Sequence, residues 1–355
     1  MPCHHPLNAY RHPHIKTASG KAKIVITGQK KPLSSSIQDW LVIPCGQCVG
    51  CKITKTKEWA IRCVHEASLY SENCFLTLTY NDECMPKDGS LHKPDFQNFM
   101  KRFRKQYQGT DAVDREIIDK HTGEVTTYTH YPIRFFHCGE YGSNKDRPHY
   151  HACVFNYDFP DKELLTTQKG VKLYVSEMLE ELWSKEVSVD ESKYHRLDNL
   201  WYRNGRLYVK LGYCRIGSVT TDSAAYVAGY IHKKIGGDPA WDHYLKEDPE
   251  GNINILQPEY ITMSRNPGIA RDWIKNNLSD AYPKDFVTSK GKKFKVPKYY
   301  DAIYDQCYPE ALEQIKLKRK EKAIALQESP ERLAAMEKCA ILNRKRIIRS
   351  YEDAS

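Results

Sequence analysis

The chain has 355 residues, of which 40% are hydrophobic and 11% aromatic, so it can bury the core of one large domain or of roughly two to three smaller ones. Its 54 Lys and Arg residues exceed its 45 Asp and Glu residues, and the net charge of +9 favours an anionic partner, with nucleic acid first. No apolar run approaches the roughly 18 residues of a membrane span, and the first residues lack the basic and apolar regions of a secretory signal. We therefore expect no membrane segment and a reducing cytoplasm, in which the 12 cysteines serve as thiols or metal ligands.

The N-terminal residues 1–57 are predicted to be rich in loops and to carry a cysteine cluster. The motif CxxCxxC, with one further cysteine near the N-terminus, suits a structural Zn2+ ion or, less well, an iron–sulfur cluster. The predicted ligands are Cys3, Cys45, Cys48 and Cys51. Cys3 is the natural fourth ligand because it would fix the N-terminus to the cluster, and His4 or His5 are alternatives. Three reduced thiols in a glycine-rich loop are the alternative without a metal.

Residues 58–130 are predicted to contain two helices, a strand and a hairpin. Residues 58–71 place apolar side chains near helical spacing, whereas 74–80 are rich in β-formers and end at an Asn-Asp turn. Residues 93–107 put apolar side chains on one helical face, which predicts an amphipathic helix with a basic outer face. Residues 109–130 are polar and turn-like, and we predict a small hairpin insertion there.

The next part of the chain is predicted to be mainly strands. Residues 131–140 and 149–156 are predicted to pair as an antiparallel hairpin, because the residues between them favour a turn. Residues 172–185 are predicted to form a helix. Residues 199–219 are predicted to hold two short strands around the turn Asn204-Gly205.

Residues 221–234 are predicted to form a helix that is capped by Thr221 or Asp222. Residues 238–300 are predicted to be irregular. Residues 308–350 alternate charges at helical spacing, which predicts solvated helices that serve either as an electrostatic arm for DNA or as a charged surface with no specific role.

These elements predict the α+β class: an antiparallel sheet with helices on one side, in a ferredoxin-like arrangement. A cysteine-rich N-terminal segment and a charged helical C-terminal tail are expected to flank it. Three parts are predicted, namely residues 1–57 with the zinc site, residues 58–240 as the domain that carries the chemistry, and residues 241–355 as an irregular region followed by the tail.

A metal site is predicted on the hairpin of 131–140 and 149–156. His149 and His151 are two residues apart on a strand, so their imidazoles point to the same side. Glu140 ends the preceding strand and can lie opposite either histidine. Two imidazoles and one carboxylate leave positions open on a divalent ion, as catalytic sites require. His137 competes as a ligand, but its parity places it on the other face from Glu140.

A nucleophile is predicted on the helix of 221–234. Tyr226 and Tyr230 are four residues apart and share one helix face, and Lys233 lies on about the same face. A tyrosine attacks a phosphodiester only where the phosphate is polarised and the hydroxyl is held in line. A metal ion on the opposite wall and a nearby lysine can meet these needs. The alternative is a tyrosine pair that packs on the sheet.

Together these motifs resemble the HUH endonuclease superfamily. The sequence His149-Tyr150-His151 looks like its metal-binding motif, residues 75–80 (FLTLTY) look like its first motif, and the spaced tyrosines are similar to those of its two-tyrosine class. Five further segments look like the replication initiation protein of gokushovirus-type microviruses. They are 1–7 (MPCHHPL), 44–51 (PCGQCVGC), 59–62 (WAIR), 138–142 (CGEYG) and 263–268 (MSRNPG). The resemblance covers most of residues 1–275.

The resemblance implies an HUH palm and roles for particular residues. It implies His149, His151 and Glu140 as metal ligands, Tyr226 and Tyr230 as paired nucleophiles, and Lys233 as the lysine that follows the second tyrosine. The DNA-binding residues that we predict are Thr77, Thr79, Tyr80, Arg147 and Lys234. Two departures from the family pattern are Tyr150, where an aliphatic residue is usual, and Gly229, where many relatives carry a lysine.

The resemblance also implies a mechanism. With Mg2+ or Mn2+ bound, one tyrosine nicks single-stranded origin DNA, forms a 5′-phosphotyrosine and frees a 3′-OH for rolling-circle replication. The imidazoles favour Mn2+, and cellular abundance favours Mg2+. The expected partners are the origin, a host helicase and a host DNA polymerase, in the cytoplasm of an infected bacterial host. The alternatives are a transposase or relaxase of the same superfamily and, outside enzymes, a zinc-stabilised DNA-binding protein.

Overall fold

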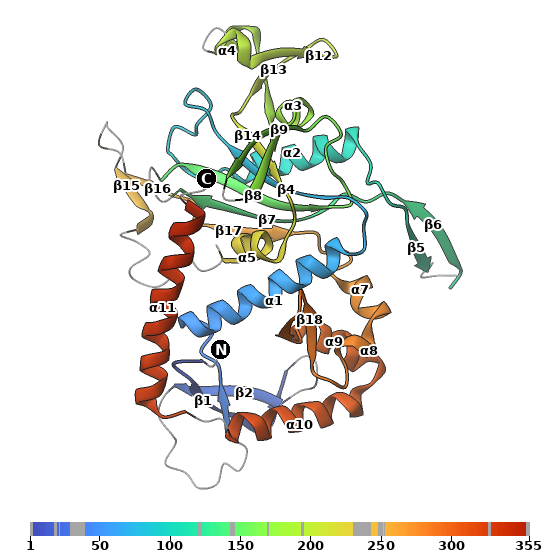
Figure 1. Cartoon of the computed structure of the whole chain (residues 1–355), viewed down its shortest axis with the longest axis vertical. Coiled ribbons are helices and arrows are strands. Elements are labelled where there is room, and N and C mark those ends of the chain that lie inside the picture. The colour runs from blue at the N-terminus through green and yellow to red at the C-terminus, as the bar shows by residue number, and fades with distance from the viewer. Residues whose placement is uncertain are drawn as a thin grey trace. The chain divides into compact units, whose positions relative to one another are not determined.

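The computed structural model describes residues 3–17, 20, 22–28, 40–118, 123–142, 146–168, 170–192, 195–229, 243–247, 251, 253–325 and 328–352 (Figure 1). The chain divides into two compact units. The first joins residues Met1–Thr56 to Glu313–Ser355, and the second is Lys57–Leu312. The larger second unit contains the central sheet.

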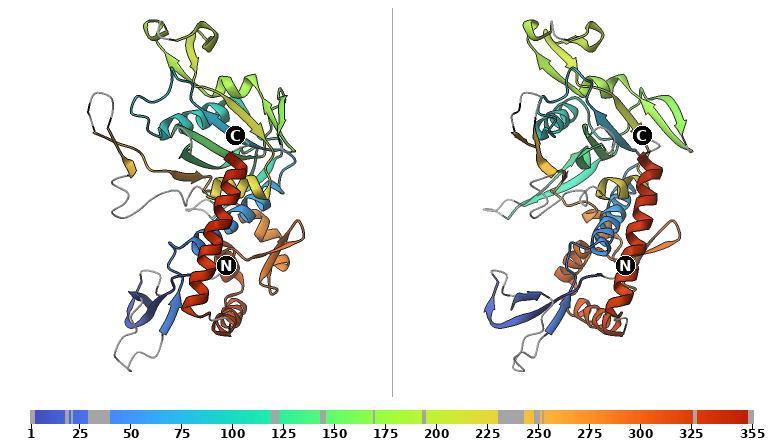
Figure 2. Two further views of the ribbon diagram at one scale, coloured as in Figure 1. Left: turned by 60° about the vertical axis from the view of Figure 1, so that its left-hand side comes forward. Right: turned by 90° about the vertical axis from the view of Figure 1, so that its left-hand side faces the viewer.

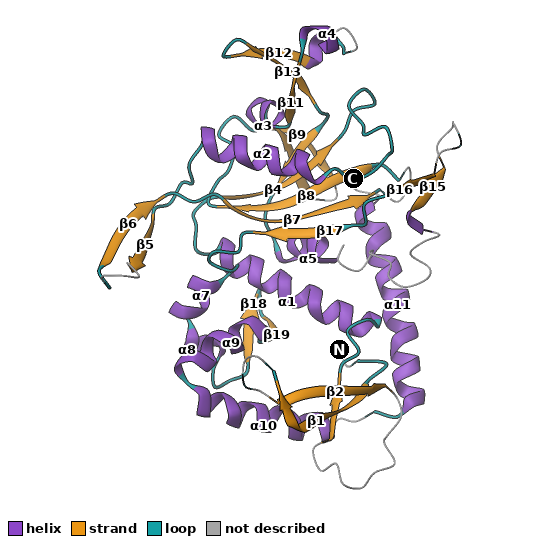
Figure 3. Cartoon of the chain, turned by 180° about the vertical axis from the view of Figure 1, so that it is seen from behind, coloured by secondary structure: helices purple, strands orange, loops and turns teal. Residues whose placement is uncertain are grey.

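The central sheet has seven strands, in the order β17-β7-β8-β4-β14-β10-β9, and all neighbouring strands are antiparallel. In chain order, its strands are β4 (Asn73–Thr79), β7 (Arg134–Tyr141), β8 (Pro148–Phe155), β9 (Glu163–Gln168), β10 (Val171–Val175), β14 (Cys214–Gly217) and β17 (Tyr260–Met263). The β7–β8 hairpin and β4 form its centre (Figure 3). Strand β4 alternates buried and half-buried residues, whereas β7 and β8 are buried along almost their whole length.

One face of this sheet, here called the core face, carries the main hydrophobic core. Leu76, Leu78, Tyr150, Ala152 and Val154 point to this face and are all buried. Helix α2 (Lys93–Gln106) packs on it through the apolar residues that the sequence places at helical spacing, Phe96, Phe99, Met100 and Phe103. Helix α3 (Glu177–Leu182) lies beside α2 and adds Leu179 and Leu182 to the same core.

The opposite face, here called the site face, is also covered by helices. Helix α5 (Thr221–Gly229) packs on β7 and β8. In α1 (Val49–Ala67), Trp59 stacks on Phe136 of β7 with ring centroids 4.9 Å apart. The α+β class with an antiparallel sheet is confirmed, but the helices lie on both faces instead of one. The reason is that β7 and β8 bury apolar side chains such as Phe136 and Cys153 on the site face as well, and these need cover.

Smaller sheets surround the central one. The predicted insertion at 109–130 is confirmed as the hairpin of β5 (Val113–Ile118) and β6 (Val125–His130). The predicted strands around Asn204-Gly205 are confirmed as β12 (Leu200–Arg203) and β13 (Arg206–Lys210). Asn204 and Gly205 have φ values of 50° and 73°, which two-residue hairpin turns require. Next to β13 lies β11 (Ser184–Val187), and α4 (Val189–Ser192) and the short helix Leu197–Asn199 precede β12.

Two predictions for this unit are wrong. Residues 172–185, predicted as one helix, form β10, α3 and β11, because residues 171–175 pair with β9 and β14 and Ser176 caps α3. Residues 238–300, predicted as irregular, contain several short helices and strands among their described residues. These are β15 (Leu245–Glu247), β16 (Ile253–Ile255), β17, α7 (Arg271–Asn276), α8 (Leu278–Ala281), β18 (Phe286–Ser289), β19 (Lys292–Lys295) and α9 (Lys298–Cys307).

The first unit is also more regular than predicted. Residues 1–57 contain a sheet in the order β2-β1-β3, built from β1 (Leu7–Lys16), β2 (Ala22–Gly28) and β3 (Trp40–Ile43). Helix α1 begins at Val49, so the helix predicted for 58–71 starts nine residues earlier than expected. The predicted helical tail is confirmed as α10 (Pro309–Ala325) and α11 (Pro330–Glu352). Among the described residues, we find no helix with the length and apolar character to cross a membrane.

The hydroxyl of Tyr150 connects the core face to the loop before α2 (Figure 2 shows α2 beside the sheet). It accepts a hydrogen bond from the His92 N–H at 2.9 Å, donates to the His92 carbonyl at 3.0 Å, and lies 2.9 Å from the Tyr80 hydroxyl. Since Tyr150 is fully buried, removal of its hydroxyl leaves buried polar groups without a partner.

We therefore expect Tyr150→Phe to lower the free energy of unfolding by about 1–3 kcal/mol, measured by urea denaturation. Tyr202→Phe, at a side chain that is 71% exposed, is the control and should change it little. Equal stability of the two variants would show that the Tyr150 hydroxyl does not support the core.

Candidate functional site

The pairing register of β7 and β8 brings together three side chains of the kinds that bind metal ions. Glu140 lies directly opposite His149, and Cys138 lies opposite His151, so all four residues share the site face. The Nε2 atoms of His149 and His151 lie 2.8 Å and 3.0 Å from the same oxygen, Oε1 of Glu140. His137 is on the core face, stacked on Phe96 at 3.4 Å, as the parity of β7 predicts.

Both imidazoles are held from behind by hydrogen bonds at Nδ1. Nδ1 of His149 lies 3.1 Å from the Arg147 carbonyl, which can only accept, so Nδ1 carries the hydrogen. Nδ1 of His151 lies 3.0 Å from the hydroxyl of Thr77 on the neighbouring strand β4. With Nδ1 occupied in this way, each Nε2 is directed at Glu140, which is the orientation that a metal ligand needs.

The three ligand atoms fit one divalent ion. Ligands at right angles on an ion with bonds of about 2.1 Å stand about 3.0 Å apart, close to the spacings observed here. The Glu140 carboxylate is 1% exposed, and its burial raises its pKa. The hydrogen bonds and charges of the two histidines outweigh this effect and hold the pKa of Glu140 below its usual range. The carboxylate is therefore charged and can hold a cation.

A tyrosine of α5 lies next to this group. The ring of Tyr226 is 5.0 Å from the ring of His151 and meets it edge to face, at 78°. The small buried residues Ala224 and Ala228 let α5 approach the sheet closely. Tyr226 is partly exposed.

The start of α5 is fixed by a reciprocal cap. The backbone N–H of Ser223 donates to the Thr220 hydroxyl at 3.0 Å, and the Thr220 N–H donates to the Ser223 hydroxyl at 2.8 Å. The predicted caps, Thr221 and Asp222, are wrong by one and two residues. The cap matters because it sets the rotation of the helix, and the rotation decides which side chain faces His151.

The other residues predicted for the site have different positions. Tyr230, Lys233 and Lys234 lie outside the residues that the structure describes. Tyr80 is 3% exposed on the core face and donates to Asp95, so its predicted contact with DNA is wrong. The assignment failed because Tyr80 has the same parity as Leu76 and Leu78, whose side chains point to the core face.

Three predicted DNA contacts lie on or near the site face. Thr77 touches His151, so its position supports the histidine directly. The hydroxyl of Thr79 donates to the Tyr213 carbonyl. Arg147 pairs with Asp82 at the turn of the β7–β8 hairpin. For all three, contact with DNA stays a prediction.

Two residues of the site face were not predicted as site residues from the sequence. Phe75 stacks beside His151 with ring centroids 5.7 Å apart, and Arg215 lies opposite Thr77 on β14. Arg215 has no ion-pair partner within the described part of the chain. The alternation along 214–217, in which Cys214 and Ile216 are buried and Arg215 points to the other face, is the signal that would have found it.

The second predicted metal site is the cysteine cluster of the first unit. The sulfur atoms of Cys3, Cys45, Cys48 and Cys51 all lie within 4.8 Å of one another. Cys48 and Cys3 have sulfurs 3.8 Å apart, the edge of a tetrahedron with Zn–S bonds of about 2.3 Å. The four sulfurs therefore fit a tetrahedral zinc ion, and the predicted fourth ligand, Cys3, is in place.

Backbone donors and neighbours support this cluster. The N–H groups of His4 and Cys45 point to cluster sulfurs at 3.3 Å and 3.2 Å. Although burial raises the pKa of Cys48, backbone donors including the His4 N–H lower it to about 6. The alternative ligands, His4 and His5, both contact Glu337. The Nε2 atom of His5 lies 2.7 Å from its carboxylate, and the His4 ring also faces it.

The chain is similar to replication-associated proteins of bacterial viruses. A family model described as "Replication-associated protein ORF2/G2P" matches residues 73–235, the range that contains Glu140, both histidines and Tyr226. The replication-associated protein VP4 of Bdellovibrio phage phiMH2K is 28% identical over 305 residues, which are 84% of this chain and 79% of that protein. The replication-associated protein ORF2 of Spiroplasma virus 4 is 30% identical over 294 residues, 79% of this chain and 74% of that protein. No solved structure matches this chain.

If Glu140, His149 and His151 hold a divalent ion, we expect Glu140→Gln to weaken Mn2+ binding by more than about 10-fold and Thr77→Val by about 10-fold to 100-fold. The first change removes a charged ligand, and the second removes the group that holds the His151 ring. Calorimetric titration with Mn2+ measures both, and Glu116→Gln on the exposed edge of β5 is the control. Unchanged Mn2+ affinity in Glu140→Gln would exclude this site.

If the four cysteines hold zinc, we expect the purified chain to contain about one zinc ion, and Cys48→Ser or a chelator to remove it and lower the melting temperature. Cys339→Ser, at an exposed cysteine of α11, should retain both the metal and the stability. Elemental analysis and thermal denaturation give the two readouts. If the chain contains no metal and its Cys48→Ser variant melts at the same temperature as the control, the four cysteines are thiols without a zinc ion.

Proposed function

The chain belongs to the replication-associated protein family described as ORF2/G2P, and we propose that it is the endonuclease that starts rolling-circle replication by nicking single-stranded origin DNA. The observation that carries this proposal is the position of Tyr226, a partly exposed tyrosine 5.0 Å from His151, at a group of three converging metal ligands. A protein that only binds DNA has no need for a phenol beside such a group.

In this proposal, the site face positions the scissile phosphate. Glu140, His149 and His151 hold Mg2+ or Mn2+, and the ion, when bound, polarises the phosphate and stabilises its developing negative charge. Thr77 and the Arg147 carbonyl keep the imidazoles oriented. Arg215 supplies a further positive charge two strands away from His151.

Tyr226 is the proposed nucleophile. Its Oη attacks the phosphorus, the bond from phosphorus to the 3′ oxygen breaks, and the departing 3′ oxygen takes up a proton. The products are a 5′-phosphotyrosine on the protein and a free 3′-OH on the DNA. Because the phosphodiester energy is kept in the phosphotyrosine, the same site can later rejoin the strand.

The second tyrosine completes the cycle in this proposal. By helical spacing, Tyr230 follows one turn after Tyr226, and Lys233 follows on about the same face. After one round of synthesis, the free tyrosine cuts the regenerated origin, and the released 3′-OH attacks the first phosphotyrosine to close a circle. A host helicase and a host DNA polymerase, in the cytoplasm of the infected bacterium, would open and copy the strand.

The alternatives are less well supported. A transposase or relaxase would share the site, but the relatives that align with most of this chain are described as replication-associated proteins. A zinc-stabilised DNA-binding protein would explain the cysteine cluster and the charge. It would not explain why Glu140, His149 and His151 meet beside Tyr226.

We expect the wild-type chain, incubated with labelled single-stranded origin DNA and Mn2+, to form an adduct that survives a denaturing gel. The double variant Tyr226→Phe with Tyr230→Phe should reduce adduct formation by at least about a thousand-fold, because no phenol remains to attack. Tyr202→Phe is the matched control. A persistent adduct in the double variant would refute the assignment of the nucleophiles, and no adduct with any variant would favour a binding protein.

A further inference from the structure

A second candidate binding site lies at the other end of β7 from Glu140. A cleft of about 900 Å³ opens where the chain enters β7, between the end of α2, the β5–β6 hairpin and the segment 263–267 that ends β17. We call it the arginine cleft, after the residues Arg104, Arg115, Arg134 and Arg265 in its walls. The segment 263–267 is part of the sequence motif 263–268, which contributes no residue to the metal site or to the surroundings of Tyr226 described above.

The charges in the arginine cleft are not balanced. None of its lining residues is acidic. Just outside the lining, Glu66 pairs with Arg134, and Asp272 pairs with Arg115 at 2.9 Å. Arg104 and Arg265 have no acidic partner within the described ranges, so the cleft keeps two positive charges open to an anion.

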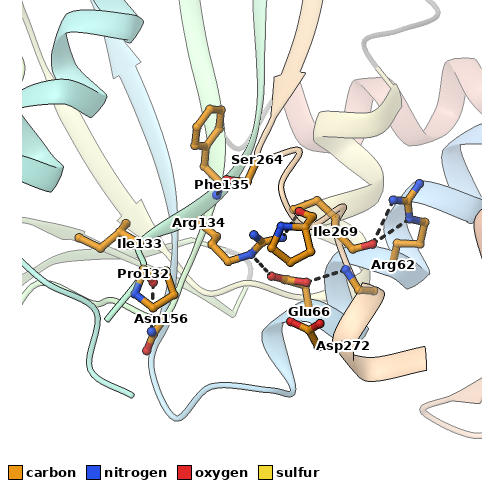
Figure 4. A network of polar contacts seen from close by, with 12 residues as sticks. Arg62, Glu66, Pro132, Ile133, Arg134, Phe135, Asn156, Ser264, Ile269 and Asp272 are labelled. Carbon is orange, nitrogen blue, oxygen red and sulfur yellow. Dashed lines mark hydrogen bonds and ion pairs between the residues drawn. The ribbon is translucent and has the colours of Figure 1, made fainter. Parts of the chain in front are cut away.

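The floor of the cleft is rigid. Arg134 is 4% exposed and donates to both the Glu66 carboxylate and the Pro267 carbonyl, and Glu66 also accepts from the backbone N–H of Ala270 (Figure 4). Arg62 donates to the Ile269 carbonyl at 3.0 Å and holds the same segment through a second contact. The cation at Arg265 therefore projects from a backbone that is held on two sides.

Aromatic side chains line the cleft beside these cations. Tyr131 is 45% exposed, Tyr107 is partly exposed, and the Arg104 guanidinium lies 5.3 Å from the ring of Phe135. Guanidinium groups next to accessible rings are the combination that binds single-stranded nucleic acid, because the cations bind phosphates and the rings stack on bases.

The surroundings favour an extended strand over a free nucleotide. Tyr107 also lines a neighbouring cavity of about 380 Å³, whose walls include Arg102, Lys105 and Arg203. The positive charges are thus spread along a path and do not converge on one point, as a triphosphate would require. Arg134 and Glu140 are six residues apart on β7, which separates the two sites by roughly 20 Å.

We propose that the arginine cleft binds single-stranded DNA that extends from the strand cut at the metal site. This inference rests on the proposed function, since it assumes that the substrate is DNA, but it assigns a separate site with its own residues. The cleft holds the phosphates with Arg104 and Arg265, and Tyr131 stacks on a base. It anchors the DNA while the scissile phosphate lies at Tyr226.

The test measures the affinity of labelled single-stranded 24-mers by fluorescence anisotropy in EDTA, where metal-dependent cutting cannot occur. Arg265→Gln is expected to weaken binding and to reduce the slope of log affinity against log salt by about 0.7, the value for one lost phosphate contact on a single strand. Tyr131→Ala should weaken binding by about five-fold or more through lost stacking. Arg265→Lys should retain the salt slope because it retains the charge.

Arg206→Gln, at an exposed arginine of β13, removes the same charge elsewhere and is the control. Melting temperatures confirm that each variant is folded. Affinity and salt slope in Arg265→Gln and Tyr131→Ala that equal those of the control would overturn the proposal. The proposal would also be overturned if these variants bound DNA normally but no longer bound ATP, because that result would identify a nucleotide site.

The same variants separate this inference from the proposed function. Wild-type protein that forms no covalent adduct contradicts the endonuclease, whereas the binding of uncut DNA in EDTA tests the cleft alone. A normal adduct in wild type with unaffected DNA binding in Arg265→Gln would leave the endonuclease intact and exclude the cleft.

Discussion

The antiparallel register of β7 and β8 is the constraint on which the candidate site depends. With Glu140 opposite His149, both histidines and the carboxylate occupy one face, and both Nε2 atoms reach the same oxygen. A shift of one residue would turn the side chains of one strand to the other face and separate the ligands. The register is strongly determined because residues of the opposite parity, such as Tyr150 and Val154, must be buried under α2.

The main hydrophobic core and the candidate site lie on different faces of the same sheet. The core face is packed by large aromatic side chains, while the site face carries a buried carboxylate, two oriented imidazoles and a tyrosine. Burial of Glu140 is offset by its contacts with His149 and His151, which hold its pKa below the usual range. Helix α5 supplies Tyr226, the proposed nucleophile, from an element separate from the strands that carry the proposed metal ligands.

Strand β7 also links the two proposed sites. Its end carries Glu140, and its beginning carries Arg134, whose ion pair with Glu66 of α1 fixes the floor of the arginine cleft. The distance between them follows from the strand alone, because a β-strand is stiff and advances by about 3.4 Å per residue. If the proposed function holds, a DNA strand in the cleft would meet the metal site at a defined spacing, which would favour a single cleavage position.

Local patterns in the sequence predicted which residues lie close together in the candidate sites. The period of two placed Glu140, His149 and His151 on one face, and the spacing of cysteines predicted the four cysteines of the N-terminal cluster. Only the tertiary structure decided that residues 171–175 are a strand, that Tyr80 is buried, and that helices cover both faces of the sheet. These outcomes depend on partners distant in the chain: β10 is a strand because β9 and β14 pair with it. The arginine cleft has the same origin, because four segments far apart in sequence build it and no local pattern shows that they meet.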